Sequence, residues 1–159
     1  MLTTGQKATL KAFIEADATL SQLAANREVY QEILDALHSL AEPDYIVWRS
    51  SLSPDLARQA IVSGDQLAQL DNLAASKRDS LIYAFSGPIN CASSAVRGAI
   101  DNLCGTQNVL KAALTAAMKR KATVLEKLFA VGSGTDASPS TLVVETALSL
   151  PELESIVEG

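Results

Sequence analysis

Apolar residues recur at helical spacing over most of the chain, which predicts a mainly α-helical protein. A first helix is expected from residue 3 or 4 to about residue 17, with Leu10 and Ile14 on the same side. A second helix is expected within residues 26–43, and Pro43 should end it.

The segment from residue 45 to 48 is β-branched and aromatic, and we expect a short extended link there. Ser53 then has the side chain of a helix N-cap, Pro54 stands at the first helical position, and Asp55 lies in the first turn. Gly64 is expected to close this helix.

Three further helices are predicted: one from residue 65 to the break at 86–90, one over 91–105, and one over 106–132. The last has the most continuous apolar stripe. Its opposite side combines one acid, Glu126, with five bases: Lys111, Lys119, Arg120, Lys121 and Lys127.

The pattern changes after residue 131. Residues 132–140 are rich in turn formers, residues 141–145 favour extended structure, and Ser149 is placed to cap a short helical turn that contains Pro151. The expected fold is therefore a single mainly α-helical bundle domain of residues 1–131, followed by an extended, acidic C-terminal arm of residues 132–159.

Composition and charge sharpen this expectation. The chain of 159 residues is 48% hydrophobic but only 4% aromatic, which favours helices packed closely through small side chains. All 13 Lys and Arg precede residue 132, as do 13 of the 18 Asp and Glu, so the last 28 residues carry the whole formal charge of -5. An acidic arm of this kind does not favour nucleic acid phosphates.

Neither a membrane span nor a leader segment is indicated by the sequence, so we expect a product made in the cytoplasm with no membrane partner. The two cysteines, Cys91 and Cys104, lie on predicted helices and are expected to be small buried hydrophobic residues.

The residues typical of catalysis are sparse. His38 is the only histidine, and no Gly-x-Ser-x-Gly elbow accompanies it. The "GSG" at 132–134 follows a helix rather than a strand, and the acidic pairs lack calcium-loop spacing. We therefore expect no enzyme activity, no cofactor and no metal.

Two groups of residues are candidates for a subunit interface. Trp48 and Arg49 combine two residue types that are enriched in binding hot spots, although a Trp closing the core beside an Arg that caps a carboxylate is the alternative. The run Lys119, Arg120 and Lys121 is expected to face an acidic protein surface, such as the arm of another copy, or else only solvent.

Two stretches carry a resemblance to a known group of proteins: "VWRSSLS" at 47–53 and "EKLFAVGSGTDASPSTL" at 126–142. With the order of elements between them, they resemble small structural proteins of tailed bacteriophages. The chain departs from that group at "VVETALS", where relatives tend to continue with an aromatic residue, an acid and a glycine.

The resemblance implies a virion protein of the neck region, a head-to-tail connector that forms a homo-oligomeric ring, expected to be a dodecamer, beneath the portal. Its partners would be the portal protein and a downstream tail or neck protein, with no sequence-specific nucleic acid. The arm would grip the portal, because an extended apolar segment needs a partner strand. The expected partner-binding residues are Gly132, Gly134, Ser138, Pro139, Thr141, Leu142, Val143 and Val144.

Two other functions are compatible with the same residues. One is a capsid cement or tail-completion protein. The other is a small intracellular regulatory protein that folds its arm back on its own body.

Overall fold

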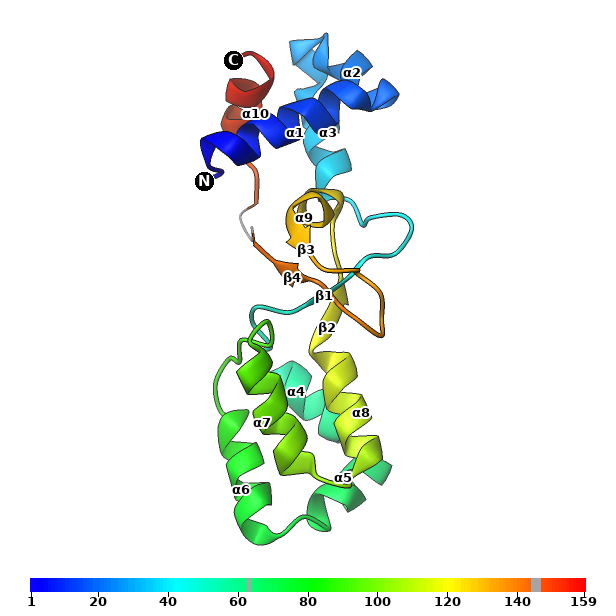
Figure 1. Ribbon diagram of the computed structural model, residues 1–159, viewed down its shortest axis with the longest axis vertical. Helices are drawn as coiled ribbons and strands as arrows, with labels where there is room; N and C mark the ends of the chain where they lie inside the picture. The colour runs from blue at the N-terminus through cyan, green and yellow to red at the C-terminus, as the bar shows by residue number, and fades with distance from the viewer. Residues whose placement is uncertain (63, 144–146) are drawn as a thin grey trace. The chain divides into compact units, whose positions relative to one another are not determined.

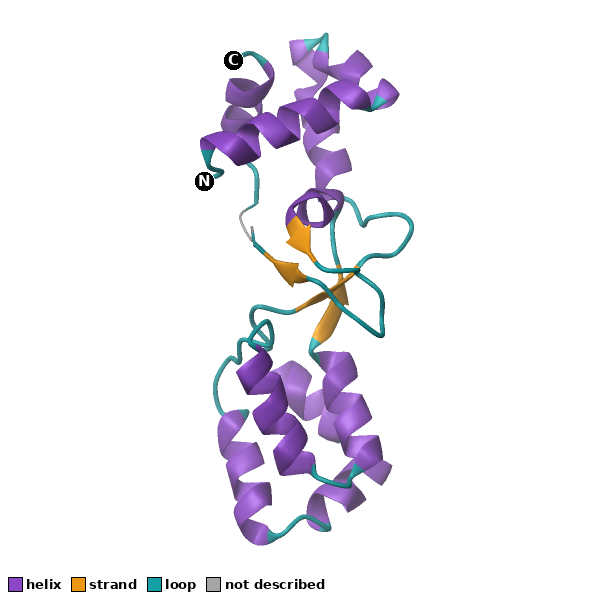
Figure 2. Ribbon diagram, in the orientation of Figure 1, coloured by secondary structure: helices purple, strands orange, loops and turns teal. Residues whose placement is uncertain are grey.

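The computed structural model describes residues 1–62, 64–143 and 147–159, and in these residues the protein is mainly α-helical, as predicted (Figures 1 and 2). The chain forms two compact units. Unit 1 consists of residues 1–46 and 121–159, and unit 2 of residues 47–120. The structure thus divides the chain differently from the expected body at 1–131 and arm at 132–159, because unit 2 is inserted within unit 1.

Unit 1 is built from short helices, most of which begin at a capping side chain. The predicted first helix is present, and Thr3 and Gln6 form a capping box at its start. The predicted second helix is shorter than expected and ends at His38, five residues before Pro43. The helices of unit 1 are α1 (Thr4–Ala16), α2 (Ala18–Ala24), the 3-10 helix η1 (Arg27–Val29), α3 (Tyr30–His38), α9 (Val124–Phe129) and α10 (Leu150–Val157).

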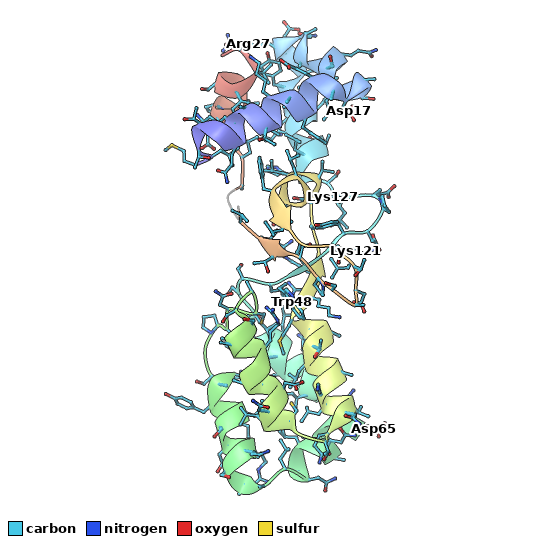
Figure 3. All side chains as sticks on the ribbon, in the orientation of Figure 1. Asp17, Arg27, Trp48, Asp65, Lys121 and Lys127 are labelled. Carbon is cyan, nitrogen blue, oxygen red and sulfur yellow. The ribbon has the colours of Figure 1, made fainter. Side chains whose placement is uncertain are left out.

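The core of unit 1 joins both ends of the chain. Helix α10 packs against α1 and α3. On the surface of unit 1, Arg27, labelled in Figure 3, forms ion pairs with Glu154 of α10 and with Glu158, the residue that follows this helix. The buried residues of this core are Leu2, Leu10, Ile14, Leu20, Tyr30, Ile33, Leu34, Leu37, Leu125, Leu148, Leu153 and Ile156.

The expected extended arm is therefore folded onto its own unit in the single chain. Ser149 is the N-cap of α10, as predicted, and forms a capping box with Glu152, but the helix is longer than the expected single turn. Its apolar residues Leu153 and Ile156 are buried, and the cost of exposing them explains why this segment does not stay extended.

Unit 2 is a group of five helices around a second core. The start of α4 is as predicted, with Ser53 as N-cap and Pro54 at the first position. Gly64 begins α5 instead of closing α4, and the single helix expected after residue 65 is two helices. The helices are α4 (Pro54–Ile61), α5 (Gly64–Asp71), α6 (Ala75–Ala84), α7 (Ser94–Cys104) and α8 (Asn108–Ala117).

The core of unit 2 contains both cysteines, which are free and buried as expected. Helix α8 is central to it, because α4, α5 and α7 all pack against α8. The buried residues are Leu52, Ala57, Ile61, Leu70, Leu73, Leu81, Phe85, Cys91, Ile100, Cys104, Leu110, Leu114 and Met118.

The prediction of one continuous helix over 106–132 is wrong. Strand β2 (Lys119–Lys121) separates α8 from α9 and pairs with β1 (Ile46–Trp48), while β3 (Ala130–Val131) follows α9. Strand β3 pairs antiparallel with β4 (Thr141–Leu142), with Ala130 opposite Leu142. No helix in the described part of the chain is long and apolar enough to cross a membrane.

Candidate functional site

A loop of unit 1 encloses the side chain of Tyr45. This loop, residues 132–140, joins β3 to β4. The Tyr45 hydroxyl donates a hydrogen bond to the carbonyl oxygen of Gly132 at 3.0 Å, and it lies 2.8 Å from the hydroxyl of Ser140. Ser140 is fully buried, so the contact with Tyr45 provides its hydroxyl with a partner.

Two glycines allow the loop to pass so close to Tyr45. Gly132 has a φ of 135° and Gly134 a φ of 66°, both in the region that favours glycine. A Cβ on Gly134 would overlap the ring of Tyr45, and a Cβ on Gly132 would crowd Ser140. The glycines therefore shape the loop instead of acting as a hinge that releases an arm.

Backbone hydrogen bonds fix the same loop. The N–H of Ile46 donates to the carbonyl oxygen of Gly134 at 2.7 Å, and the N–H of Ser140 donates to the carbonyl oxygen of Ile46 at 2.9 Å. One residue of β1 thus bridges the two ends of the loop. The ammonium group of Lys127 lies 5.8 Å from the centre of the Tyr45 ring, within the range of a cation–π contact.

The residues expected to form a partner-binding arm are placed as follows. Gly132, Gly134 and Ser138 belong to the loop; Ser138 accepts a hydrogen bond from Ser133 through its carbonyl oxygen and donates one to Thr135 through its N–H. Pro139 is half-buried there, and Thr141 and Leu142 pair with β3 of the same chain.

Val143, the next residue, is 63% exposed, whereas Val144 lies outside the described residues. Thr141 and Leu142 are therefore already paired within their own chain. Strand β3 is the partner strand that we expected another protein to supply. A role for these residues in binding a partner stays a prediction.

The predicted basic cluster is not a helix face. Lys119, Arg120 and Lys121 form strand β2. The ammonium group of Lys121 pairs with the carboxylate of Asp44 at 2.7 Å within unit 1, whereas Lys119 and Arg120 belong to unit 2. The reason for the difference is the pairing with β1, which no local pattern in the sequence shows.

In unit 2, Trp48 is half-buried and in contact with a guanidinium group. The Cζ atom of Arg97 lies 4.3 Å from the centre of the Trp48 ring, and the ammonium group of Lys119 lies 5.9 Å from it. Arg97 also donates hydrogen bonds to the carbonyl oxygens of Cys91 and Ala92, at 2.7 and 2.8 Å. These bonds hold Arg97 in place against the ring of Trp48, which is labelled in Figure 3.

Arg49, which was predicted with Trp48 to lie at a subunit interface, makes its described contacts at the end of α8. Its side chain donates to the carbonyl oxygen of Ala117 at 3.0 Å, and its backbone N–H donates to that of Met118 at 2.8 Å. A cation at a helix C-terminus is favourable, because the carbonyl groups there carry partial negative charge. Arg49 thus caps a helix instead of a carboxylate.

A pocket of about 340 Å³ opens beside Trp48, entirely within unit 2. Two of its lining residues, Ile100 and Met118, are apolar and buried. Charged groups surround them, including the ion pair of Lys111 with Asp101. The lining residues are Trp48, Arg97, Gly98, Ile100, Asp101, Lys111, Thr115 and Met118. We call this the Trp48 pocket.

Neither cysteine has the environment of a nucleophile. Burial raises the pKa of the Cys91 thiol, and the charges of Arg97 and Arg49 offset only part of that effect. Burial also raises the pKa of the Cys104 thiol, with a further contribution from Asp101. Both thiols are therefore protonated near neutral pH, and the reactive form of a cysteine is the thiolate.

His38 lies exposed at the end of α3. Among the described residues, no group of three or more His, Cys, Asp or Glu side chains is arranged to hold a metal ion.

Reasoning from the sequence missed Tyr45, Arg97, Gly98 and Ser140. Tyr45 and Ser140 are 95 residues apart in the sequence, so no local pattern could have shown that they are in contact. A signal did exist for Gly98, because a glycine inside a helix is less favourable than alanine and calls for a reason.

Comparison of the chain with models of protein families, with curated proteins and with solved structures found no match.

Proposed function

We propose that the protein is a structural component of a tailed-phage virion, a head-to-tail connector whose copies assemble into a ring. The resemblance of residues 47–53 and 126–142 to phage structural proteins motivates this proposal. The observation that carries it is the unequal distribution of charge between the two units.

Unit 1 is strongly acidic and unit 2 is basic. Unit 1 has 13 Asp and Glu against 5 Lys and Arg, a formal charge of -8. Unit 2 has 5 Asp and Glu against 8 Lys and Arg, a formal charge of +3. The two values give the net charge of -5 for the chain.

Opposite charges on two parts of one chain favour contacts between different surfaces of neighbouring copies. Unit 2 of one copy attracts unit 1 of the next, and repeated head-to-tail contacts close into a ring if the rotation between copies permits. Each exposed ion pair contributes less than about 1 kcal/mol, so charge guides the encounter and the orientation, while apolar burial provides the affinity.

Docking on a portal would use the small sheet of β3 and β4 instead of a detached arm. Val131 of β3, which pairs with Thr141, and Val143, which directly follows β4, are 67% and 63% exposed. Exposed β-branched residues on a short strand suit the addition of a partner strand.

Electron microscopy and sedimentation of the purified protein at low and high ionic strength test this proposal. We expect rings at low salt that dissociate at high salt, because ions screen the attraction between units. Rings that then bind a purified portal would support the connector role. A monomer under both conditions would contradict the proposal.

A second candidate function is a monomeric regulatory protein. The packing of α10 on α1 and α3 favours it, because the C-terminal segment then serves the protein's own core. The sedimentation experiment separates the two functions, since a regulator of this kind would stay monomeric at low salt.

A further inference from the structure

Gly98 lies inside helix α7 (Ser94–Cys104), where a glycine is unfavourable and no contact with the described residues requires it. Glycine loses more conformational freedom than alanine when a helix forms. A Cβ on Gly98 would meet no atom within 4 Å, so close packing inside the chain is not the reason for a glycine here. A remaining use of glycine is to leave room for a group from outside.

Gly98 is exposed and is one of the residues that line the Trp48 pocket. The buried residues Ile100 and Met118 and the ring of Trp48 give the pocket an apolar interior suited to an aliphatic side chain. Arg97 and Lys111 outnumber Asp101 among its lining residues, so its rim favours acidic groups on either side of that side chain.

Unit 1 displays such a segment. Leu40 is 57% exposed, although leucine is usually buried, and Glu42 and Asp44 follow it on the exposed surface. Asp44 already pairs with Lys121 of its own copy, so the match to the Trp48 pocket rests on Leu40 for the apolar interior and on the carboxylate of Glu42 for the basic rim.

We propose that the Trp48 pocket of one copy receives Leu40 and Glu42 from unit 1 of a second copy. This inference rests on the proposed function and names the contact that would link neighbours in the ring. The contact joins two different surfaces, so each copy can offer Leu40 to one neighbour and its pocket to another.

The test is to fill the pocket without disturbing the fold. Gly98→Gln places a long side chain in the open space and exchanges glycine for a better helix former. Two variants are controls. Gly98→Ala also replaces glycine by a better helix former, but its side chain is too small to fill the pocket. Gly5→Gln makes the same exchange in α1, where a Cβ also meets no atom within 4 Å. Circular dichroism and a thermal melt verify that each variant folds.

Self-association is then measured by sedimentation at low salt and by the fluorescence of Trp48, the only tryptophan. We expect Gly98→Gln and Leu40→Ser each to weaken association by about tenfold or more, as the loss of a central contact does, while Gly98→Ala and Gly5→Gln associate like the wild type. A mixture of Gly98→Gln and Leu40→Ser should form dimers that do not grow further, because one intact contact remains per pair.

Rings of Gly98→Gln that form as readily as those of the wild type would overturn this inference and leave the proposed connector function standing. A wild-type chain that stays monomeric at low salt would overturn both.

Discussion

The hydroxyl groups of Tyr45 and Ser140 lie 2.8 Å apart, and through this contact the loop of residues 132–140 is fastened to the residue that precedes β1. Ser140 is the one polar side chain that is fully buried in the described part of the protein. The loop of residues 132–140 is thus held by a specific polar contact within unit 1.

Tyr45→Phe should lower the free energy of unfolding by about 1–3 kcal/mol, because the Ser140 hydroxyl loses its partner in a buried position. Urea denaturation measures the change. Tyr83→Phe is the matched control, since Tyr83 is 80% exposed and should tolerate the loss of its hydroxyl. Equal stability of the two variants would show that the contact with Ser140 contributes nothing.

Gly134→Ala should destabilise the protein by at least about 1 kcal/mol. Alanine disfavours a φ of 66°, and its methyl group would overlap the ring of Tyr45. The same exchange at Gly98 should raise stability by roughly 0.5–1 kcal/mol, because that glycine lies in a helix with open space beside it. Thermal melts of both variants compare the two effects, and a stabilising Gly134→Ala would refute the close approach to Tyr45.

Leu153→Ala should cost about 2–5 kcal/mol, since the Leu153 side chain is fully buried between helices of unit 1. Leu67→Ala removes the same atoms from a side chain that is 46% exposed and should lower the free energy of unfolding much less.

Because Leu153 belongs to the core of unit 1, a chain cut after Val131 should lose the cooperative melt of unit 1. A truncated chain that melts as cooperatively as the full chain would contradict this prediction and show that the core of unit 1 does not need the C-terminal segment.

Glu152 provides a pH-dependent contribution to α10. The backbone N–H and the hydroxyl of Ser149 both donate to its carboxylate and lower its pKa below the ordinary glutamate value of 4.5. Because the pKa is lower in the folded state, this contribution is present above pH 4.5 and is lost as the pH falls through the lowered pKa. Glu152→Gln, which keeps a capping side chain but no charge, should therefore be less stable than the wild type at neutral pH and equally stable in acid. Denaturation curves of both proteins across this pH range measure the difference in their free energies of unfolding. A difference that does not change with pH would refute the effect of the charge.

Local signals in the sequence predicted some elements well. Ser53 and Ser149 were each predicted as helix caps, because a capping side chain is encoded next to the helix that it caps, and the first helix was predicted to start at residue 3 or 4. A similar signal was overlooked at Thr123, where the Thr-x-x-Glu pattern with Glu126 marks the start of α9 and contradicts one long helix over 106–132.

The strand pairing and the contacts of the candidate site could not be predicted from such local signals. Strand β2 consists of Lys119, Arg120 and Lys121, which do not favour extended structure, and it forms because β1 pairs with it. The contact of Arg97 with Trp48 likewise joins residues far apart in sequence. The burial of Leu153 also depends on helices at the other end of the chain, so the apolar residues of the C-terminal segment looked as if they needed a partner protein.

Because unit 2 is inserted within unit 1, unit 2 can complete its folding on the ribosome before unit 1 can. All residues of unit 2 have been synthesised once Arg120 is added, and domains generally fold as units during synthesis. Helices α1 and α3, although made first, must wait for Leu153 and Ile156 to cover their apolar faces. Helices α1 and α3 are thus translated before unit 2 but reach their final structure after it, and in the interval their apolar residues stay exposed to solvent.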